Sequence, residues 1–212
     1  ANRIVVVTGA ASGIGRALAR RFHAAGAESV VCADLDGDGV SAVAGEVGGL
    51  ACIVNVGIED EVRALIESVE REKGPIDLFC SNAGISVAGG PEVGNDDWQR
   101  IWDINLMAHV YAVRHMAPRM ATRGGCYLLN TASAAGLLSQ IGSAPYAVTK
   151  HAAVGLAEWL AITYGDQGIK VSVLCPQAVR TAMTAGHEDA VASIDGMMEP
   201  EPVAEACLHA IA

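Results

Sequence analysis

Short apolar runs alternate with amphipathic stretches along the whole chain. Six of these runs are rich in Val, Ile, Leu or Cys and are apolar at consecutive rather than alternate positions. Such runs are typical of strands that are buried on both faces, as in a parallel sheet. We therefore predict strands at Ile4–Thr8, Ser29–Ala33, Ala51–Val54, Leu78–Ser81, Tyr127–Thr131 and Lys170–Leu174.

Helical patterns fill the stretches between these strands, with apolar side chains on one stripe and charged side chains opposite. The predicted helices are Gly13–Ala25, Glu59–Lys73, Trp98–Met120, Tyr146–Tyr164 and Pro202–Ala212. Strand and helix in alternation indicate right-handed crossovers, and hence an α/β fold with one doubly wound, Rossmann-like parallel sheet and helices on both faces. Residues 88–95 and 181–200 are predicted to be loops over the carboxyl edge of the sheet. Because the sequence shows no internal repeat and no linker, we expect residues 1–212 to form a single domain.

Composition narrows the class of protein. A formal net charge of −10 argues against nucleic-acid binding, which needs clustered Lys and Arg. No apolar stretch reaches the ~20 residues of a membrane helix, and the N-terminus shows no secretory signal. The six cysteines form no CxxC pair, and the histidines lack ligand spacing, so we expect reduced thiols and no metal. These features predict a soluble, cytoplasmic protein that binds neither nucleic acid nor membrane.

A glycine-rich turn, Thr8-Gly-Ala-Ala-Ser-Gly-Ile-Gly15, joins the first strand to the first helix. Glycines let a backbone approach a phosphate pair, and a helix N-terminus offers free N–H groups and the positive end of its dipole. The alternative is a tight strand–helix turn without a ligand, but the position between a strand and a helix favours a dinucleotide. The residues predicted to contact it here are Gly9, Ser12, Gly13, Ile14 and Gly15.

Asp34 ends the second predicted strand and is followed by Leu35. A carboxylate at this place accepts hydrogen bonds from the ribose hydroxyls of NAD and repels the additional phosphate of NADP. No Lys or Arg stands beside Asp34 to bind that phosphate. The sequence therefore favours NAD over NADP. It places Asp34 and Leu35 at the adenosine end of the cofactor.

Tyr146 and Lys150 are spaced so that their side chains share one face of a predicted helix, and Ser133 follows a predicted strand. Oxidation of an alcohol requires a base for the hydroxyl proton, but free tyrosine has a pKa near ~10. Lowering that pKa by ~3 units takes roughly 4 kcal/mol. An ammonium about 4 Å away supplies about that much at an effective dielectric constant of ~20. Ser133 would orient the substrate oxygen beside Tyr146.

Together, the glycine turn, Asn82-Ala83-Gly84, Asn105, Ser133 and Tyr146-x-x-x-Lys150 resemble the short-chain dehydrogenase/reductase superfamily, collinearly over nearly the whole chain. The resemblance implies that Tyr146 is the acid/base and that Lys150 lowers its pKa and holds the nicotinamide ribose. It implies that Ser133 orients substrate and that Asn105 supports a water-linked proton relay. The remaining cofactor contacts that it implies, besides Tyr146 and Lys150, are Asn55, Val56, Asn82, Ala83, Gly84, Pro176 and Thr181.

The chain departs from the family pattern in several places. Asn55 stands where many relatives have an aspartate, and Pro176-Gln177 replaces the usual Pro-Gly. Relatives usually continue into a seventh strand and a tail that help to form the substrate pocket. The sequence shows no such strand, so either mobile or trimmed segments are absent from it or the pocket is unusually open. Candidate residues of the substrate wall are Val87, Leu137, Gln140 and Gln177.

The expected activity is hydride transfer between NAD(H) and a neutral or hydrophobic secondary alcohol or ketone. Two long helices, Trp98–Met120 and Tyr146–Tyr164, carry more apolar surface than one sheet face covers, and in relatives these helices pair, so we expect a homodimer or homotetramer. The main alternative is a regulatory protein that binds the dinucleotide without turnover. An epimerase or dehydratase on the same fold would normally need a further domain for which the chain has no room.

Overall fold

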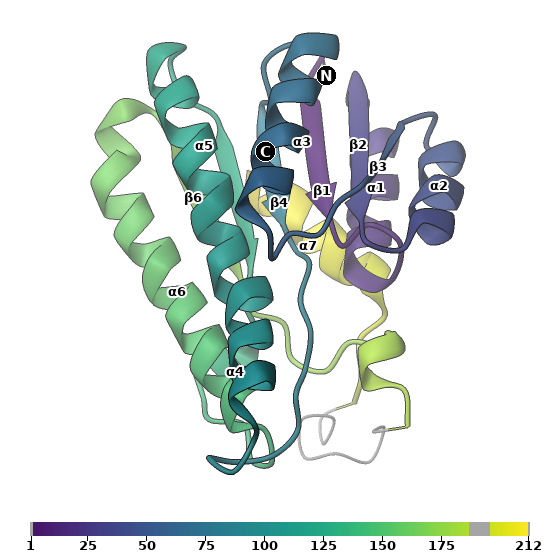
Figure 1. Ribbon diagram of the computed structural model, residues 1–212. Coiled ribbons are helices and arrows are strands. Elements are labelled where there is room, and N and C mark those ends of the chain that lie inside the picture. The colour runs from purple at the N-terminus through teal and green to yellow at the C-terminus, as the bar shows by residue number, and fades with distance from the viewer. Residues whose placement is uncertain (1, 187–195, 212) are drawn as a thin grey trace.

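A computed structural model describes residues 2–186 and 196–211, and it contains one twisted parallel sheet (Figure 1). The six strands lie in the order β3-β2-β1-β4-β5-β6, and every neighbouring pair is parallel. Their bounds are β1 (Ile4–Thr8), β2 (Ser29–Asp34), β3 (Leu50–Ile53), β4 (Leu78–Ser81), β5 (Tyr127–Thr131) and β6 (Lys170–Leu174). The predicted doubly wound α/β fold is confirmed, and the ends of β2 and β3 differ from prediction by one residue.

Both faces of the sheet are buried, which explains why the central strands are apolar at every position. In β1, Val5 and Val7 pack into the core on one face, whereas Ile4 and Val6 pack into the core on the other. The edge strands β3 and β6 are only partly buried. The consecutive apolar residues of the central strands are therefore explained by a sheet that is covered on both faces.

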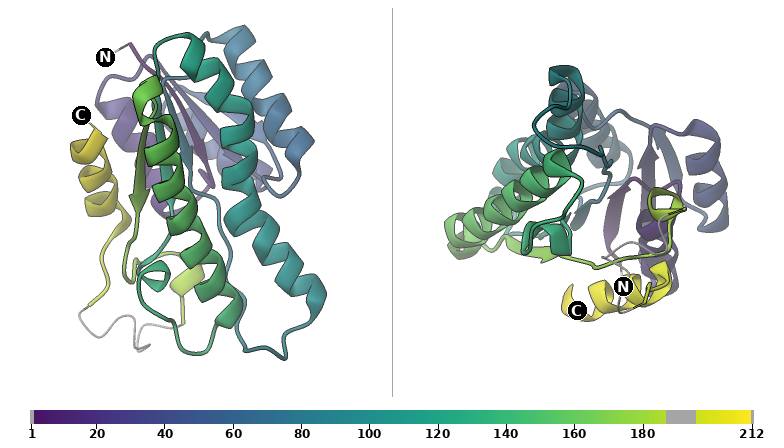
Figure 2. Two further views of the ribbon diagram at one scale, coloured as in Figure 1. Left: turned by 90° about the vertical axis from the view of Figure 1, so that its left-hand side faces the viewer. Right: turned by 90° about the horizontal axis from the view of Figure 1, so that it is seen from below.

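Helices cover the sheet in two layers (Figure 2). The first core includes side chains of α1 (Gly13–Ala24), α2 (Gly37–Glu46) and α7 (Pro200–Ile211). The second includes side chains of α3 (Glu59–Glu72), α5 (Ala108–Thr122) and α6 (Ala144–Tyr164). Helix α1 packs along α7, and α3 packs along α5. None of the helices in the described part of the chain has the length and apolar character needed to cross a membrane.

Helix α2 is absent from the prediction made from the sequence pattern. Three of its residues are glycines, which destabilise a helix because they lose the most backbone entropy. The structure supplies two compensations. The Asp36 carboxylate caps the helix by accepting a hydrogen bond from the Gly39 N–H at 3.1 Å, and Val40 and Val43 are buried against the sheet.

The predicted helix Trp98–Met120 is interrupted. Helix α4 (Asn95–Trp102) leads into a π-helical turn, η1 (Asp103–Met107), from which α5 continues. Single π turns inside α-helices are frequent at functional sites. This turn contains Asn105, which is buried.

The described loops lie where the sequence places them. Residues 88–94 are irregular, and within residues 181–186 and 196–199 the only regular element described is a short 3₁₀ turn, η4 (Ala182–Thr184). The remainder of the predicted loop 181–200 lies outside the described residues. The six cysteines are free, with Cys32, Cys80 and Cys207 buried.

His109, in the first turn of α5, is a buried polar residue without an evident partner. It is 1% exposed, and neither ring nitrogen has a hydrogen-bond partner within the described residues. Its burial, with a smaller contribution from the positive charge of Lys150, lowers the pKa of His109 to about 3. The imidazole is therefore neutral at physiological pH and acts as a packing group.

We predict that His109→Leu makes the protein less sensitive to acid. An unfolded histidine takes up a proton near pH ~6.5, whereas folded His109 does so only near a pKa of about 3. Between these values the unfolded state binds more protons, so stability falls as the pH falls. At about pH 5 this histidine costs about 2 kcal/mol relative to neutral pH. Urea unfolding at both pH values measures the effect, and an equal acid-induced loss in both proteins contradicts it.

Candidate active site

A pocket of about 350 Å³ opens at the carboxyl edge of the sheet, beside the reversal of strand order between β1 and β4. Seventeen of the eighteen residues predicted from the sequence line it, and Asn105 is the exception. They are Gly9, Ser12, Gly13, Ile14, Gly15, Asp34, Leu35, Asn55, Val56, Asn82, Ala83, Gly84, Ser133, Tyr146, Lys150, Pro176 and Thr181. Of the candidate wall residues, Gln177 also lines it.

The glycine turn forms one end of this pocket, and each of its glycines is needed for close approach. A Cβ on Gly9, whose φ is +68°, would lie 2.8 Å from the Cα of Ala83. A Cβ on Gly15 would lie 2.0 Å from the Gly9 carbonyl oxygen, so only glycine lets α1 begin against the turn. Gly13 has a φ of +51° and packs against the methyl group of Thr181. The three glycines thus let the turn pack closely against Ala83, Thr181 and the start of α1.

Ser12 is the N-cap residue of α1, and its side chain makes no capping hydrogen bond. The N–H groups of the first helical turn have no partners within the helix. Residues of this turn line the pocket, so the positive end of the helix dipole lies at its edge. This arrangement suits a pair of phosphates.

The Asp34 carboxylate is held in place at the end of β2. Its Oδ2 accepts a hydrogen bond from the Ala11 N–H at 3.0 Å, and its Oδ1 accepts one from the Asp36 N–H at 3.1 Å. The carboxylate therefore links β2 to the glycine turn. Leu35 beside it is 66% exposed.

Asn55, beyond the end of β3, has part of its hydrogen-bonding capacity already in use. Its Oδ1 accepts a hydrogen bond from the Gly57 N–H at 3.0 Å, and its backbone N–H donates to the Glu61 carboxylate at 2.6 Å. Val56, next in the chain, is buried. The side chain of Asn55 thus shapes its own turn, a contact that the sequence pattern did not reveal.

Asn82 ties three strands together at the carboxyl edge. Its Nδ2 donates to the Thr8 carbonyl at 3.0 Å, and its Oδ1 accepts from the Thr131 hydroxyl at 3.1 Å. The Thr8 hydroxyl in turn accepts from the backbone N–H groups of Asn82 and Ala83. The ends of β1, β4 and β5 are therefore cross-linked directly below the pocket. From the sequence, Thr8 was named only as the first residue of the glycine turn, and Thr131 only as the end of a strand.

Lys150 lies at the centre of the site and is 3% exposed. Its Nζ donates a hydrogen bond to the Thr131 carbonyl at 3.0 Å and lies 5.5 Å from the centroid of the Tyr146 ring. Burial lowers the pKa of Lys150 to about 8, because the ammonium loses hydration. A Cβ on Gly84 would lie 3.4 Å from this Nζ, so glycine there leaves the lysine head uncrowded.

Tyr146 and Ser133 line the same pocket. Burial raises the pKa of Tyr146, and its hydrogen bond with Ser133 offsets part of that rise. The lowered pKa expected for Tyr146 from the sequence is therefore wrong for the free protein, because burial removes hydration from the phenolate. Ser133 also accepts a hydrogen bond from the Ala135 N–H at 3.1 Å, within the turn η2 (Ala134–Gly136). A Cβ on Gly136 would lie 2.5 Å from the Lys150 carbonyl, so this turn packs directly on α6 and brings Ser133 to Tyr146.

Asn105 lies in the π turn η1, behind the pocket wall, and is fully buried. Its Oδ1 accepts from the Ile85 N–H at 2.8 Å, and its Nδ2 donates to the Ile85 carbonyl at 2.9 Å. The side-chain amide therefore clamps the segment after β4. The same Nδ2 lies 3.3 Å from the Thr149 hydroxyl. Ile85 and Thr149 are partners that sequence reasoning missed.

The arrangement fits a dinucleotide at one end and acid/base chemistry at the other. The glycine turn and Asp34 provide phosphate and ribose partners, and Tyr146, Ser133 and Lys150 gather further along the same pocket. Within the described residues, no three His, Cys, Asp or Glu side chains gather as metal ligands do.

Comparisons with known proteins agree with this geometry. The chain is 38% identical over 189 residues to meso-2,3-butanediol dehydrogenase of Serratia marcescens, covering 87% of this chain and 74% of that protein. It is 31% identical over 215 residues to a cyclohexanol dehydrogenase of Acinetobacter sp., covering 96% of this chain and 85% of that protein.

A solved structure has the same fold. The short chain dehydrogenase/reductase of Burkholderia phymatum, crystallised in complex with NAD, superposes with a TM-score of 0.92 at 28% identity. The match covers 99% of this chain and 85% of that one. In addition, the sequence profile of the short chain dehydrogenase family matches residues 3–192. The chain belongs to the short-chain dehydrogenase family of oxidoreductases.

Proposed function

We propose that residues 1–212 form one NAD-binding oxidoreductase domain that interconverts secondary alcohols and ketones. The observation that carries the proposal is the gathering of Ser133, Tyr146 and Lys150 on one pocket that also contains the glycine turn and Asp34. The relatives named above are dehydrogenases of small secondary alcohols by their names, which supports the substrate class. Bound NAD⁺ would accept the hydride that leaves the alcohol carbon, and NADH would return it.

The residues of the chain supply orientation and proton transfer. The Ser133 hydroxyl, whose interaction with the Tyr146 phenol lowers the pKa of that phenol, holds the substrate oxygen beside it. In ketone reduction the neutral phenol donates its proton to that oxygen, and in alcohol oxidation the phenolate accepts the hydroxyl proton. Burial raises the pKa of Tyr146, so the proton-donating form predominates near neutral pH in the free protein.

Lys150 has two tasks in this scheme. Its ammonium, 5.5 Å from the Tyr146 ring centroid, favours the phenolate once the proton has been taken by substrate. Its position on the pocket wall also suits a hydrogen bond to the nicotinamide ribose, for which the Thr131 carbonyl holds it ready. Asn105 supports a proton relay from Lys150 by fixing the segment after β4, which it clamps through Ile85.

The pocket favours a neutral, largely apolar substrate. Ile85 and Met183 contribute apolar side chains to the pocket wall, whereas Leu137, a candidate from the sequence, is exposed and does not line the pocket. Apart from Lys150, the basic residue nearest in sequence to the lining residues 181–184 is Arg180, and its guanidinium pairs with Glu199 at 2.8 Å. A carboxylate or phosphate on the substrate would therefore have to compete with Glu199 for this cation.

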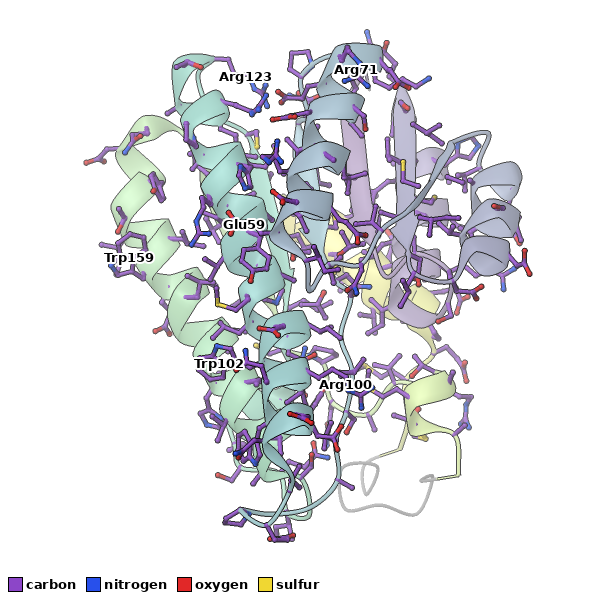
Figure 3. All side chains as sticks on the ribbon, in the orientation of Figure 1. Glu59, Arg71, Arg100, Trp102, Arg123 and Trp159 are labelled. Carbon is purple, nitrogen blue, oxygen red and sulfur yellow. The ribbon has the colours of Figure 1, made fainter. Side chains whose placement is uncertain are left out.

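A second copy of the chain is the proposed partner. Helix α6 carries an exposed apolar stripe at helical spacing, formed by Val148, Trp159 and Ile162, which are 47%, 56% and 84% exposed. Trp159 points away from the body of the protein in Figure 3. An apolar stripe of this kind on a long surface helix is covered when two copies pair in a homodimer, or pairwise in a homotetramer.

We predict that Tyr146→Phe abolishes turnover without preventing cofactor binding. Removing the hydroxyl removes the proton donor and acceptor, and general acid–base catalysis contributes about 10²–10⁴-fold. NADH absorbance with a panel of secondary alcohols measures turnover, and NADH fluorescence measures binding. Wild-type protein that binds NADH but turns over no alcohol or ketone would favour a regulatory role instead.

We predict that Asp34→Asn weakens the preference for NAD over NADP by about tenfold or more, equivalent to about 1.4 kcal/mol. The amide can keep the hydrogen bond from Ala11 but lacks the charge that repels the additional phosphate. Steady-state kcat/KM with NADH and NADPH tests this. Asp36→Asn is the matched control, since Asp36 caps α2 and does not line the pocket. A wild-type preference for NADPH contradicts the role of Asp34.

We predict that Ile162→Glu lowers the molar mass in solution by half or more. A carboxylate in the centre of an apolar contact loses its hydration without gaining a partner. Light scattering after size exclusion measures the mass. Arg71→Glu on α3, whose side chain is 68% exposed, is the control. An unchanged mass for Ile162→Glu places the contact elsewhere.

A further inference from the structure

Thr149 lies on α6, the helix that carries Tyr146, and its hydroxyl contacts Asn105 of the π turn η1. It stands immediately before Lys150 on α6 and is fully buried, so its side chain reaches no solvent and does not line the pocket. A buried hydroxyl without hydrogen-bond partners is costly, and a valine of the same shape would fill the same space. The partners of the Thr149 hydroxyl therefore indicate what this residue does.

The hydroxyl makes contacts on both sides. As a donor, the hydroxyl is shared between two carbonyl oxygens of its own helix. Its Oγ1 lies 2.9 Å from the Pro145 oxygen and 3.0 Å from the Tyr146 oxygen. It also accepts a hydrogen bond from the Asn105 Nδ2 at 3.3 Å. The hydroxyl thus donates its hydrogen to the first turn of α6 and accepts a hydrogen bond from η1.

Through Asn105 the chain of hydrogen bonds continues to the other wall of the pocket. The Asn105 amide binds both the N–H and the carbonyl of Ile85. Ile85 and its neighbour Gly84 line the pocket, and a Cβ on Gly84 would lie 3.3 Å from the Asn105 Oδ1. One continuous path therefore runs from the segment after β4, through Asn105 and Thr149, to the backbone of Tyr146.

We propose that Thr149 is a positioning residue, whose hydroxyl fixes the first turn of α6, and with it the Tyr146 phenol, at a set distance from the segment after β4. The inference rests on the function proposed above. A threonine hydroxyl that bonds the carbonyls three and four residues earlier bends a helix slightly at that turn. Here that turn begins at Pro145 and carries Tyr146, so the bend and the bond to Asn105 together direct the phenol toward Ser133.

A second contact between the same two segments shows why this position matters. The Ser143 hydroxyl, at the start of α6, donates to the Val87 carbonyl at 2.5 Å, and the Gly89 N–H donates to the Gly142 carbonyl at 2.9 Å. The segment after β4 is thus attached to the start of α6 further along as well. Thr149 supplies the attachment on the side of Tyr146 and Lys150.

The test compares Thr149→Val with Thr149→Ser in the full chain. Valine keeps the shape and removes the hydroxyl, whereas serine keeps the hydroxyl. We expect Thr149→Val to lower kcat for alcohol oxidation about tenfold with KM for NAD⁺ unchanged, and Thr149→Ser to restore most of kcat. Thermal unfolding shows that each variant is folded at the assay temperature. Ser68→Ala is the matched control, because the Ser68 hydroxyl makes a similar bond to the Leu65 carbonyl in α3, away from the pocket.

A double-mutant cycle with Asn105→Ala tests whether the hydroxyl acts through Asn105. We expect Thr149→Val to reduce kcat by less than twofold when Asn105 is already alanine. If Thr149→Val is folded and keeps the kcat of the wild-type protein, Thr149 is not a positioning residue. The proposed function still stands in that case, because the wild-type protein turns over alcohol. Additive losses, or a Thr149→Ser variant as slow as Thr149→Val, also overturn the role of Thr149. If the wild-type protein turns over no alcohol or ketone, both the role of Thr149 and the proposed function are overturned.

Discussion

The Lys150 ammonium is buried at the carboxyl edge of the sheet, and the rest of the site is organised by the need to satisfy it. A buried cation is tolerated only when it is hydrogen-bonded, and the Thr131 carbonyl provides that bond at 3.0 Å. Thr131 is in turn bound to Asn82, which is bound to Thr8 at the start of the glycine turn. One lysine is thus connected through side chains and backbone to both ends of the pocket.

Burial affects the two ionisable groups of the site in a consistent way. It raises the pKa of Tyr146 and lowers the pKa of Lys150 to about 8, because the charged form of each loses hydration. The phenol therefore keeps its proton in the free protein, which is the form that the proposed reduction of a ketone needs. The same low-dielectric surroundings strengthen the attraction between an ammonium and any phenolate that forms beside it. The free protein thus already has the environment that acid/base chemistry requires.

Much of the fold could be predicted because its strands carry a simple signal. Runs such as Ile4–Thr8 are apolar at each position since both faces of the sheet are covered. Helix α2 could not be predicted, since its glycines give it low intrinsic helicity and its stability comes from the Asp36 cap and from burial of Val40 and Val43. The π turn at Asp103–Met107 was equally invisible, because the apolar pattern of α4 and α5 runs through it.

By itself the sequence determined the alternation of strands and helices, the glycine turn and the order of Ser133, Tyr146 and Lys150, since these depend on local spacing. The tertiary structure decided which groups those residues bind. The Asn105 amide meets the Ile85 backbone and the Thr149 hydroxyl, and Asn82 meets Thr131, across 20 to 49 residues of chain. Such contacts depend on strand register and on the packing of helices against the sheet. Neither the strand register nor this packing can be read from a local pattern of residues.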